Sequence, residues 1–401
     1  MTGNSNSQGT TADARDLDIG FWFPRPERGA RLAEELRRRG HAVTIYHHLP
    51  VPGDQTHVRR VDYDLLGGLR ILRRLGHDVM YTSRSFLPVL QLRINKLLTG
   101  RPYVYTLNGA AWAYHRERRA ASRLPGAAAV LYPWLLKRAV GGASAVVANS
   151  AFLAHELRAR FPAHAAKIST IYNGIDYEAV EAGKGGAGEW PPGKVRVLSV
   201  VTSTFERKSE GVRLLLDAFE LMCRRYQGLS YLIAARTTRP MSVEGLRSAM
   251  QELDCADQVK LELNRRDVPD LLAAADLFLY ATPPDSSDSM PRAVLEAQAA
   301  GVPTVTTATT GCAEAVLEGE TGRAIPYDAE AVAQAALDLL ENPEEASRMA
   351  ARARESVRER FNWEAMADEY QDLFLRATGR TPAGLQTNAE EGRASSMAGR
   401  L

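Results

Sequence analysis

The chain has 401 residues, 45% hydrophobic and 24% charged, which is average for a soluble globular protein and allows two domains with separate cores. No apolar run approaches the length needed to span a bilayer, and the three cysteines show neither disulfide nor metal spacing, as is typical of a reducing compartment. The net charge of +2 conceals an asymmetry: residues 1–150 hold 22 Lys/Arg against 11 Asp/Glu, so the remainder is acidic. The basic part is suited to an anionic partner, although many of its arginines would also fit solvated helix faces.

Residues 1–17 are polar and lack an apolar core, so we expect a disordered leader and not a signal peptide. From residue 18 on, apolar strand patterns alternate with amphipathic helices, which predicts parallel βαβ units in a Rossmann-like domain over 18–180. The predicted strands are 18–23, 42–48, 78–83, 103–109, 145–150 and 168–176; the predicted helices are 28–41, one near 86–99 and one that ends near 140.

Residues 181–194, "EAGKGGAGEWPPGK", are rich in Gly and Pro and are predicted to be a linker. The alternation then restarts and predicts a second Rossmann-like domain over 195–360. Residues 361–380 are predicted to form an amphipathic helix, and 381–401 a disordered tail. The second domain's predicted strands are 195–202, 230–235, 258–263, 276–282, 303–308 and 322–326, with helices at 211–226 and 291–300. The fold class is therefore α/β, with two doubly wound parallel sheets.

The stretch "DSMPRAVLEAQAAGVPTV" (288–305) bears the clearest chemical signal. Pro291 suits a first helical turn and Gly301 a helix end, so a helix begins at the carboxyl end of a predicted strand, where its amides suit phosphate. Asp288 precedes this helix and Glu296 lies within it; a carboxylate there can accept hydrogen bonds from a ribose or another sugar. The alternative is that Glu296 only pairs with Arg292 on an exposed helix face.

The same stretch resembles the acid–seven residues–acid motif of retaining GT-B glycosyltransferases, the large family related to sucrose and glycogen synthases. Four further segments resemble family segments in the same order: "RRRGHAVTIY" (37–46), "VVANS" (146–150), "IYNGID" (171–176) and "TTGCAEAVLEGETGRAIP" (309–326). The likeness covers most of residues 18–376. It implies two Rossmann-like domains facing across a cleft, a C-terminal domain for a nucleotide-diphospho-sugar donor and an N-terminal domain for the acceptor.

The resemblance also implies roles for particular residues. Glu296 takes the place of the ribose-binding acid, Asp288 that of the acid contacting the transferred sugar, and Lys208 that of the diphosphate-binding lysine. The sequence departs from the family at Asp288, which is shorter than the usual Glu, and at Ser203, where the family has an arginine that Arg207 or Arg213 would replace. Asn108 stands where the family often has a histidine near the transferred sugar. We expect further donor contacts from Arg207, Ser289, Met290, Pro291 and Leu295.

The resemblance thus predicts a glycosyltransferase that retains anomeric configuration and uses a UDP-, GDP- or dTDP-sugar. We expect no metal or other required cofactor, because the histidines lack metal-ligand spacing. The expected acceptor is a hydroxyl-bearing glycan, lipid-linked sugar or small natural product; no nucleic acid partner is expected. We expect a cytoplasmic protein whose basic first half permits peripheral contact with anionic lipid at the inner membrane face. Alternatives are a sugar-nucleotide epimerase on the same fold and a non-catalytic nucleotide-sugar-binding protein. A dinucleotide-dependent oxidoreductase is disfavoured, because no G-x-G-x-x-G follows either domain's first strand.

Overall fold

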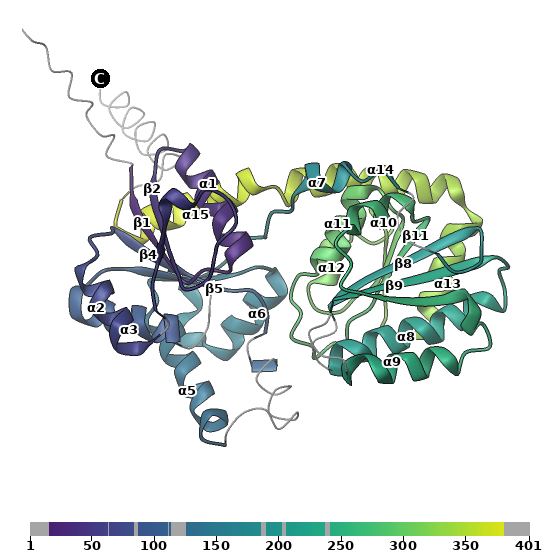
Figure 1. The fold of residues 1–401 in the computed structure, drawn as a ribbon, viewed down its shortest axis with the longest axis horizontal. Helices are drawn as coiled ribbons and strands as arrows, with labels where there is room; N and C mark the ends of the chain where they lie inside the picture. Colours follow the sequence, from purple (N-terminus) through teal and green to yellow (C-terminus); the bar gives the residue numbers. More distant parts are fainter. Residues whose placement is uncertain are drawn as a thin grey trace, which may run out of the picture. The chain divides into compact units, whose positions relative to one another are not determined.

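The computed structural model describes residues 16–62, 64–83, 87–110, 112–113, 126–185, 190–202, 206–236 and 241–380. They form two compact units (Figure 1). The first unit contains the chain up to Thr106, together with Arg138–Val146 and the residues from Ala367 on; the second contains Leu107–Lys137 and Val147–Met366.

The N-terminal half contributes a seven-stranded sheet with the order β3-β2-β1-β4-β5-β6-β7. β1 pairs in parallel with both β2 and β4, so the strand order reverses between β1 and β4. The strands are β1 (Asp18–Trp22), β2 (Ala42–His47), β3 (Val58–Arg60), β4 (Val79–Thr82), β5 (Tyr103–Leu107), β6 (Ala145–Ala148) and β7 (Ile168–Thr170). The helices are α1 (Pro26–Arg38), α2 (Leu65–Arg74), α3 (Leu87–Thr99), α5 (Gly126–Gly142), α6 (Ala151–Arg160) and α7 (Tyr177–Glu181).

The second half contributes a six-stranded sheet with the order β10-β9-β8-β11-β12-β13, again built from parallel pairs. Its strands are β8 (Val195–Thr202), β9 (Leu229–Arg236), β10 (Val259–Leu263), β11 (Leu277–Tyr280), β12 (Thr304–Thr307) and β13 (Arg323–Ile325). Its helices are α8 (Glu206–Cys223), α9 (Met241–Gln251), α10 (Val268–Ala274), α11 (Arg292–Ala300), α12 (Cys312–Ala315), α13 (Ala329–Glu341), α14 (Pro343–Arg360) and α15 (Trp363–Ala377). The predicted α/β class with two doubly wound parallel sheets is confirmed.

The central strands are buried on both faces, which explains why they are almost continuously apolar. β11, with the sequence "LFLY", is buried throughout, and its Phe278 lies in the same core as Phe219 of α8 and Tyr231 of β9. The core therefore holds β8 and β11 rigidly side by side, and it fixes the position of the segments that leave their carboxyl ends.

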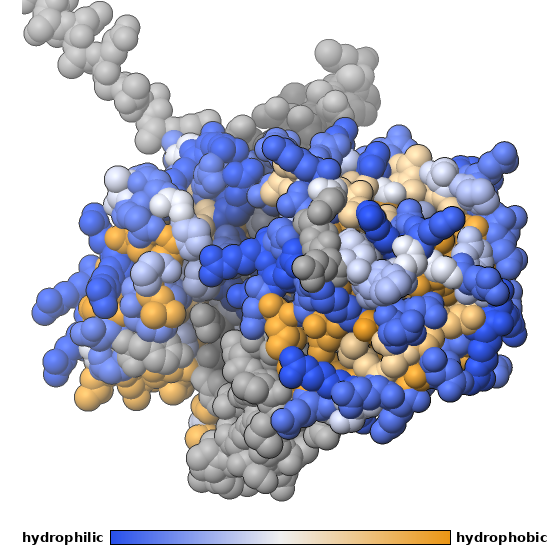
Figure 2. Space-filling model, turned by 45° about the vertical axis from the view of Figure 1, so that its right-hand side comes forward, coloured by the Kyte–Doolittle hydropathy of each residue, from blue (hydrophilic) through white to orange (hydrophobic). Residues whose placement is uncertain are grey.

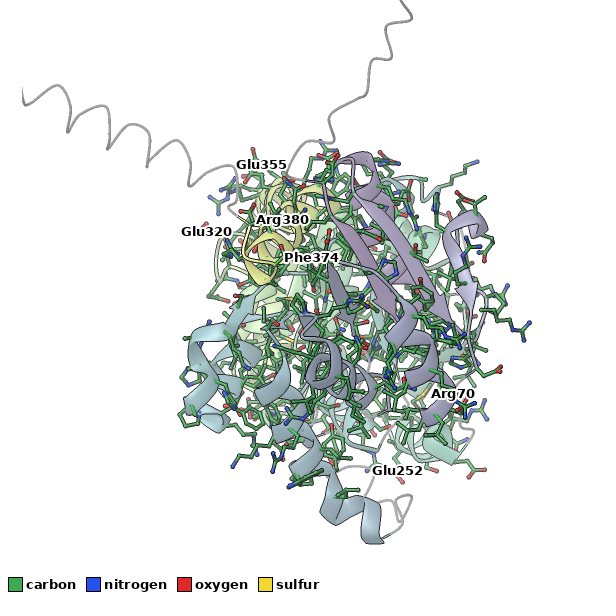
Figure 3. All side chains as sticks on the ribbon, turned by 90° about the vertical axis from the view of Figure 1, so that its left-hand side faces the viewer. Arg70, Glu252, Glu320, Glu355, Phe374 and Arg380 are labelled. Atoms are coloured by element: carbon green, nitrogen blue, oxygen red, sulfur yellow. The ribbon has the colours of Figure 1, made fainter. Side chains whose placement is uncertain are left out.

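The terminal helix α15 packs on the first sheet through its second half. The Thr106 and Tyr370 hydroxyls lie 2.8 Å apart, and the rings of Tyr370 and Phe374 each meet Tyr81 edge-on. Figure 3 labels Phe374 on this helix. Burial of these aromatic rings ties the C-terminal helix to the first unit.

The structure also contains elements that the patterns did not predict. These are α2, which has two adjacent glycines in its first turn, the short strand β3, the helices α6 and α7, and α14, whose sequence is mostly polar. α8 begins at Glu206, earlier than its apolar periodicity indicated, and β7 ends at Thr170. The expected leader, apart from residues 16–17, and the expected tail, together with linker residues 186–189, lie outside the described residues.

Candidate functional site

The strand order of the second sheet reverses between β8 and β11, and ligands of open α/β sheets bind at such a point, beyond the carboxyl ends of the strands. Two segments leave the sheet there: the start of α8 after β8, and the loop 281–291 leading into α11 after β11. They approach closely, because a Cβ on Gly211 of α8 would overlap the carbonyl of Ala281. Lys208 and Arg207 belong to the first turn of α8, but their side chains lie outside the described residues, as does Ser203.

Asp288 is held within the loop by buried hydroxyl groups. The Tyr280 hydroxyl donates to Asp288 Oδ2 at 3.0 Å, and the Asp288 amide donates to Ser286 Oγ at 3.0 Å. Ser286 Oγ in turn lies 2.8 Å from Thr282 Oγ1. Burial, and the negative charge of Asp288 nearby, raise the pKa of Tyr280 well above its usual value, so the phenol remains a hydrogen-bond donor. The carboxylate therefore has a fixed position at the end of β11.

The segment that contains Asn108 lies against the same loop. The Ala110 amide donates to the Ser287 carbonyl at 3.0 Å, and a Cβ on Gly109 would meet that carbonyl at 2.8 Å. Gly109 is therefore needed for the close backbone approach. The structure thus brings the chain around Asn108 next to the chain around Asp288, although 180 positions separate the two residues in the sequence.

Ser289 is tied to a segment singled out by the resemblance. Its Oγ donates to Asn149 Oδ1 at 2.5 Å, and both residues are buried. Met290 and Leu295 are also buried and belong to the hydrophobic core of the second sheet, whereas Pro291 is the residue before the first turn of α11. These four residues therefore shape and anchor the start of α11.

Glu296 lies in the middle of α11 and forms the ion pair that its spacing allows. Arg292 Nη2 donates to Glu296 Oε1 at 2.9 Å; the two side chains are 37% and 20% exposed. The surrounding helix is closely packed, since Val294, Leu295 and Ala297 are fully buried. Glu296 thus forms the predicted ion pair with Arg292, and its side chain is partly buried, one turn beyond the start of the helix.

A second loop borders the site just before α12. Thr310 adopts a left-handed backbone conformation with φ of 52°, and a Cβ on the following Gly311 would collide with the carbonyl of Ser289. Thr309 Oγ1 also donates to the Thr282 carbonyl at 2.6 Å. Such strain at a non-glycine residue is characteristic of functional loops. Burial raises the pKa of the neighbouring Cys312 thiol to about 12, so this cysteine is an inert packing residue.

Glu314 joins three segments near this loop through contacts that the sequence did not reveal by itself. Its carboxylate accepts hydrogen bonds from the amides of Ala151 (2.7 Å) and Phe152 at the start of α6, and from the Tyr172 hydroxyl at 2.9 Å. A negative charge is favourable at a helix N-terminus. Two segments that carried the resemblance, those of Glu314 and Tyr172, therefore meet at this carboxylate, together with the helix that directly follows a third, residues 146–150.

The first unit contains an open cavity of about 490 Å³ at the amino ends of its strands, away from the ends where such sheets bind ligands. Its cations are already engaged: Lys96 donates to Ser144 Oγ at 2.8 Å, and Arg380 pairs with Asp78 at 3.3 Å.

Within the described ranges, no three His, Cys, Asp or Glu side chains are grouped so that they could hold a metal ion. Among the helices that the structure describes, none has the length and apolarity needed to cross a bilayer.

The chain matches a family model described as "Glycosyl transferases group 1" over residues 196–342. It matches a second, described as "Glycosyltransferase Family 4", over residues 30–179. Together the two matches cover most of both sheet domains.

Among curated proteins, the chain is similar to the glycogen synthase of Mycobacterium tuberculosis, with 27% identity over 253 residues, 61% of this chain and 56% of that protein. It therefore spans about half the length of that relative. It is 33% identical to the N-acetyl-alpha-D-glucosaminyl L-malate synthase of Bacillus anthracis over 126 residues, 31% of this chain and 32% of that protein. The alpha-maltose-1-phosphate synthase of Mycolicibacterium smegmatis is 23% identical over 369 residues, 83% of this chain and 90% of that protein.

Two solved structures show the same fold. Sucrose-phosphate synthase of Thermosynechococcus elongatus superposes with a TM-score of 0.72 at 17% identity, covering 90% of this chain and 98% of that one. Anabaena HepE in complex with UDP and glucose gives a TM-score of 0.66 at 18% identity, covering 89% and 98%. The two parallel sheets thus have the GT-B architecture.

Proposed function

The chain belongs to the group 1 glycosyltransferases, which have the GT-B architecture, and from this premise we propose that it moves a sugar from a nucleotide-diphospho-sugar to an acceptor hydroxyl with retention of anomeric configuration. The observation that carries the proposal is the loop 281–291 at the switch point of the second sheet. There Asp288 is held by Tyr280, next to the segment of Asn108.

In this proposal the donor lies over the carboxyl ends of β8 and β11. Glu296 accepts hydrogen bonds from the ribose hydroxyls, while Lys208 and Arg207 offset the charge of the diphosphate. The amides of Ser289 and Met290, together with those of the first residues of α11 after Pro291, face the same phosphates in this proposal. Leu295 anchors the helix in the core.

The chemistry then requires little acid–base work from the protein. The acceptor hydroxyl attacks the anomeric carbon on the face that the diphosphate leaves, and the departing phosphate oxygen takes the acceptor's proton. Asp288 orients the transferred sugar through its hydroxyls, and Asn108 can donate and accept hydrogen bonds without itself titrating. Positive groups near the diphosphate stabilise the charge that develops there.

The donor in this proposal is a UDP-, GDP- or dTDP-sugar, with UDP supported by the Anabaena structure solved with UDP and glucose. The acceptor is a glycan, a lipid-linked sugar or a small natural product, and catalysis needs no metal. The site of action is the cytoplasm or the inner face of the membrane. A thermal-shift screen of the three nucleotide classes would identify the base, because a bound ligand raises the apparent melting temperature.

Glu296→Ala tests the ribose role against the simple ion pair. Loss of hydrogen bonds to a charged acceptor costs about 2–4 kcal/mol, so the variant should bind the nucleotide roughly a hundredfold more weakly. Arg292→Ala is the matched control, because an i,i+4 pair on a partly exposed helix face contributes only about 0.2–0.5 kcal/mol. Isothermal titration with the nucleotide measures both. Small and equal effects would mean that Glu296 serves only the ion pair.

Radiolabelled donors separate the transferase from its two alternatives. A transferase should hydrolyse its donor slowly in the absence of acceptor and release free sugar. An epimerase would return an isomeric sugar nucleotide, and a binding protein would show affinity without turnover. Either of these last results would overturn the proposed function.

A further inference from the structure

Helix α3 of the first unit has apolar residues on its outer side as well as on its buried side. Val89 and Leu92 are buried, whereas five residues at helical spacing are partly or fully exposed: Leu87, Leu90, Ile94, Leu97 and Leu98. Leu97 is 73% and Leu98 59% exposed. A surface helix normally places polar residues on its outer side, so this exposed stripe needs an explanation.

Helix α2 adds to the same surface. The Gln91 side chain of α3 donates to the Asp64 carbonyl at 2.7 Å, which holds the start of α2 beside the middle of α3. The first two residues of α2, Leu65 and Leu66, are both exposed, Leu66 to 66%. In Figure 2, hydrophobic residues gather along the lower left of the molecule, the side on which Figure 1 draws α2 and α3. We name these exposed leucines and the three exposed arginines of α2, Arg70, Arg73 and Arg74, the α2/α3 face.

The charged residues of this face have one sign. α2 and α3 contain no Asp or Glu; their basic residues are Arg70, Arg73, Arg74, Arg93 and Lys96. The three arginines of α2 are exposed, and Figure 3 labels Arg70 at the surface. Two acids, Asp62 and Asp64, precede α2, and Asp64 accepts a hydrogen bond from the Gly67 amide as the cap of the helix. Further along the chain, residues 79–155 hold a single acid, Glu117.

We propose that the α2/α3 face docks on an anionic phospholipid bilayer. Leucines at a helix surface enter the boundary between headgroups and acyl chains, while flanking arginines meet lipid phosphates. A second copy of this face would bring like charges together, whereas an anionic bilayer offers opposite charge over its whole surface. The proposal concerns the first unit and does not rest on the proposed transferase activity.

Co-sedimentation of the full chain with vesicles tests the proposal. Binding is expected to phosphatidylcholine vesicles that contain phosphatidylglycerol, with little binding to phosphatidylcholine alone, and it should weaken as salt rises. Leu97→Ser/Leu98→Ser should weaken binding roughly tenfold or more, because the exposed leucines no longer enter the lipid. Arg70→Ser/Arg73→Ser should weaken it about fivefold for each arginine and reduce its salt dependence.

Leu49→Ser is the matched control, because Leu49 is 51% exposed in the same unit but lies outside α2 and α3. It should bind vesicles like the parent chain, and all variants should retain the parent's circular dichroism and melting temperature. The proposal is overturned if the parent chain does not bind anionic vesicles, or if Leu49→Ser loses as much binding as the α3 variant. It is equally overturned if sedimentation velocity shows that the face instead joins two copies of the chain. Donor binding, measured separately, reports on the proposed function, so the two can fail independently.

Discussion

Helices α11 and α3 are both short of acidic residues, yet their surroundings in the fold are opposite. α11 is closely packed on most of its surface and has one carboxylate, Glu296, in a partly buried position beside an anchored loop. α3 has no carboxylate at all and leaves leucines exposed beside arginines. A low acid content therefore occurs in two different surroundings. We propose a polar ligand for the lone acid of the packed helix and a lipid partner for the leucines exposed among basic residues.

The largest expected difference between the two regions is in tolerance to substitution. Gly311→Ala should destabilise the protein by about 2 kcal/mol or more and abolish nucleotide binding, because the new methyl group would collide with the Ser289 carbonyl. Leu98→Ser should change the free energy of unfolding by only about 0.5 kcal/mol, since Leu98 is exposed. Urea unfolding measures both variants.

Gly76→Ala is the control for the glycine substitution, because nothing lies within 4 Å of the Cβ that it would add. Its stability should be close to that of the parent chain. If Gly311→Ala were equally stable and bound nucleotide normally, the loops around α11 would not be the tightly built site described above, and the contrast with α3 would disappear.

A smaller effect should follow from removing the hydroxyl that holds Asp288. Tyr280→Phe removes a hydrogen bond to a carboxylate, worth about 1.5–3 kcal/mol, so kcat should fall by at least about tenfold while nucleotide affinity stays unchanged. Because the pKa of Tyr280 is raised far above its usual value, this loss should be the same at pH 6 and pH 9.

Tyr231→Phe is the matched control for that variant. Tyr231 is also fully buried, and its hydroxyl lies 2.8 Å from Ser199 Oγ and not beside Asp288. It should cost a similar amount of stability and leave kcat intact. Equal losses of kcat in the two variants would show that Tyr280 supports the core and does not position Asp288.

The sequence alone predicted the repeating architecture and the bounds of α11 closely. Pro291 and Gly301 bracket α11 by local rules, and the Arg292–Glu296 pair follows from helical spacing. α2 was missed because Gly67 and Gly68 weaken its helical pattern, although Asp64 caps it.

Contacts within the site were less accessible to prediction. The bond from Ser289 to Asn149 joins residues 140 positions apart, and Glu314 reaches the start of α6 across more than 160 positions. Local propensity does not encode such pairs, because they arise only when the sheets are assembled. The resemblance pointed to the segments that contain them, but it did not assign these partners.

The smallest expected effect is a change of stability with pH, which depends on the buried titratable groups and differs between the two units. In the second unit, Tyr280 and Cys312 have raised pKa values and stay neutral near neutral pH. In the first unit, burial lowers the pKa of His41, whose Nδ1 accepts a hydrogen bond from the Leu17 amide at 3.2 Å. The folded state thus favours neutral histidine. This stabilisation is complete above the unfolded-state pKa of about 6.5 and declines as the pH falls toward the folded-state value.

His41→Asn should therefore be less sensitive to acid than the parent chain, because the amide oxygen can accept the Leu17 hydrogen bond without binding a proton. Melting temperatures at pH 7.5 and pH 5.5 measure the effect. The parent should lose more between these two values than the variant, and the variant should be slightly less stable at pH 7.5 owing to imperfect packing. An equal loss in both chains would mean that His41 is protonated as readily in the folded first unit as in the unfolded chain. In that case His41 would not make the first unit more sensitive to acid than the region around α11, where Tyr280 and Cys312 stay neutral.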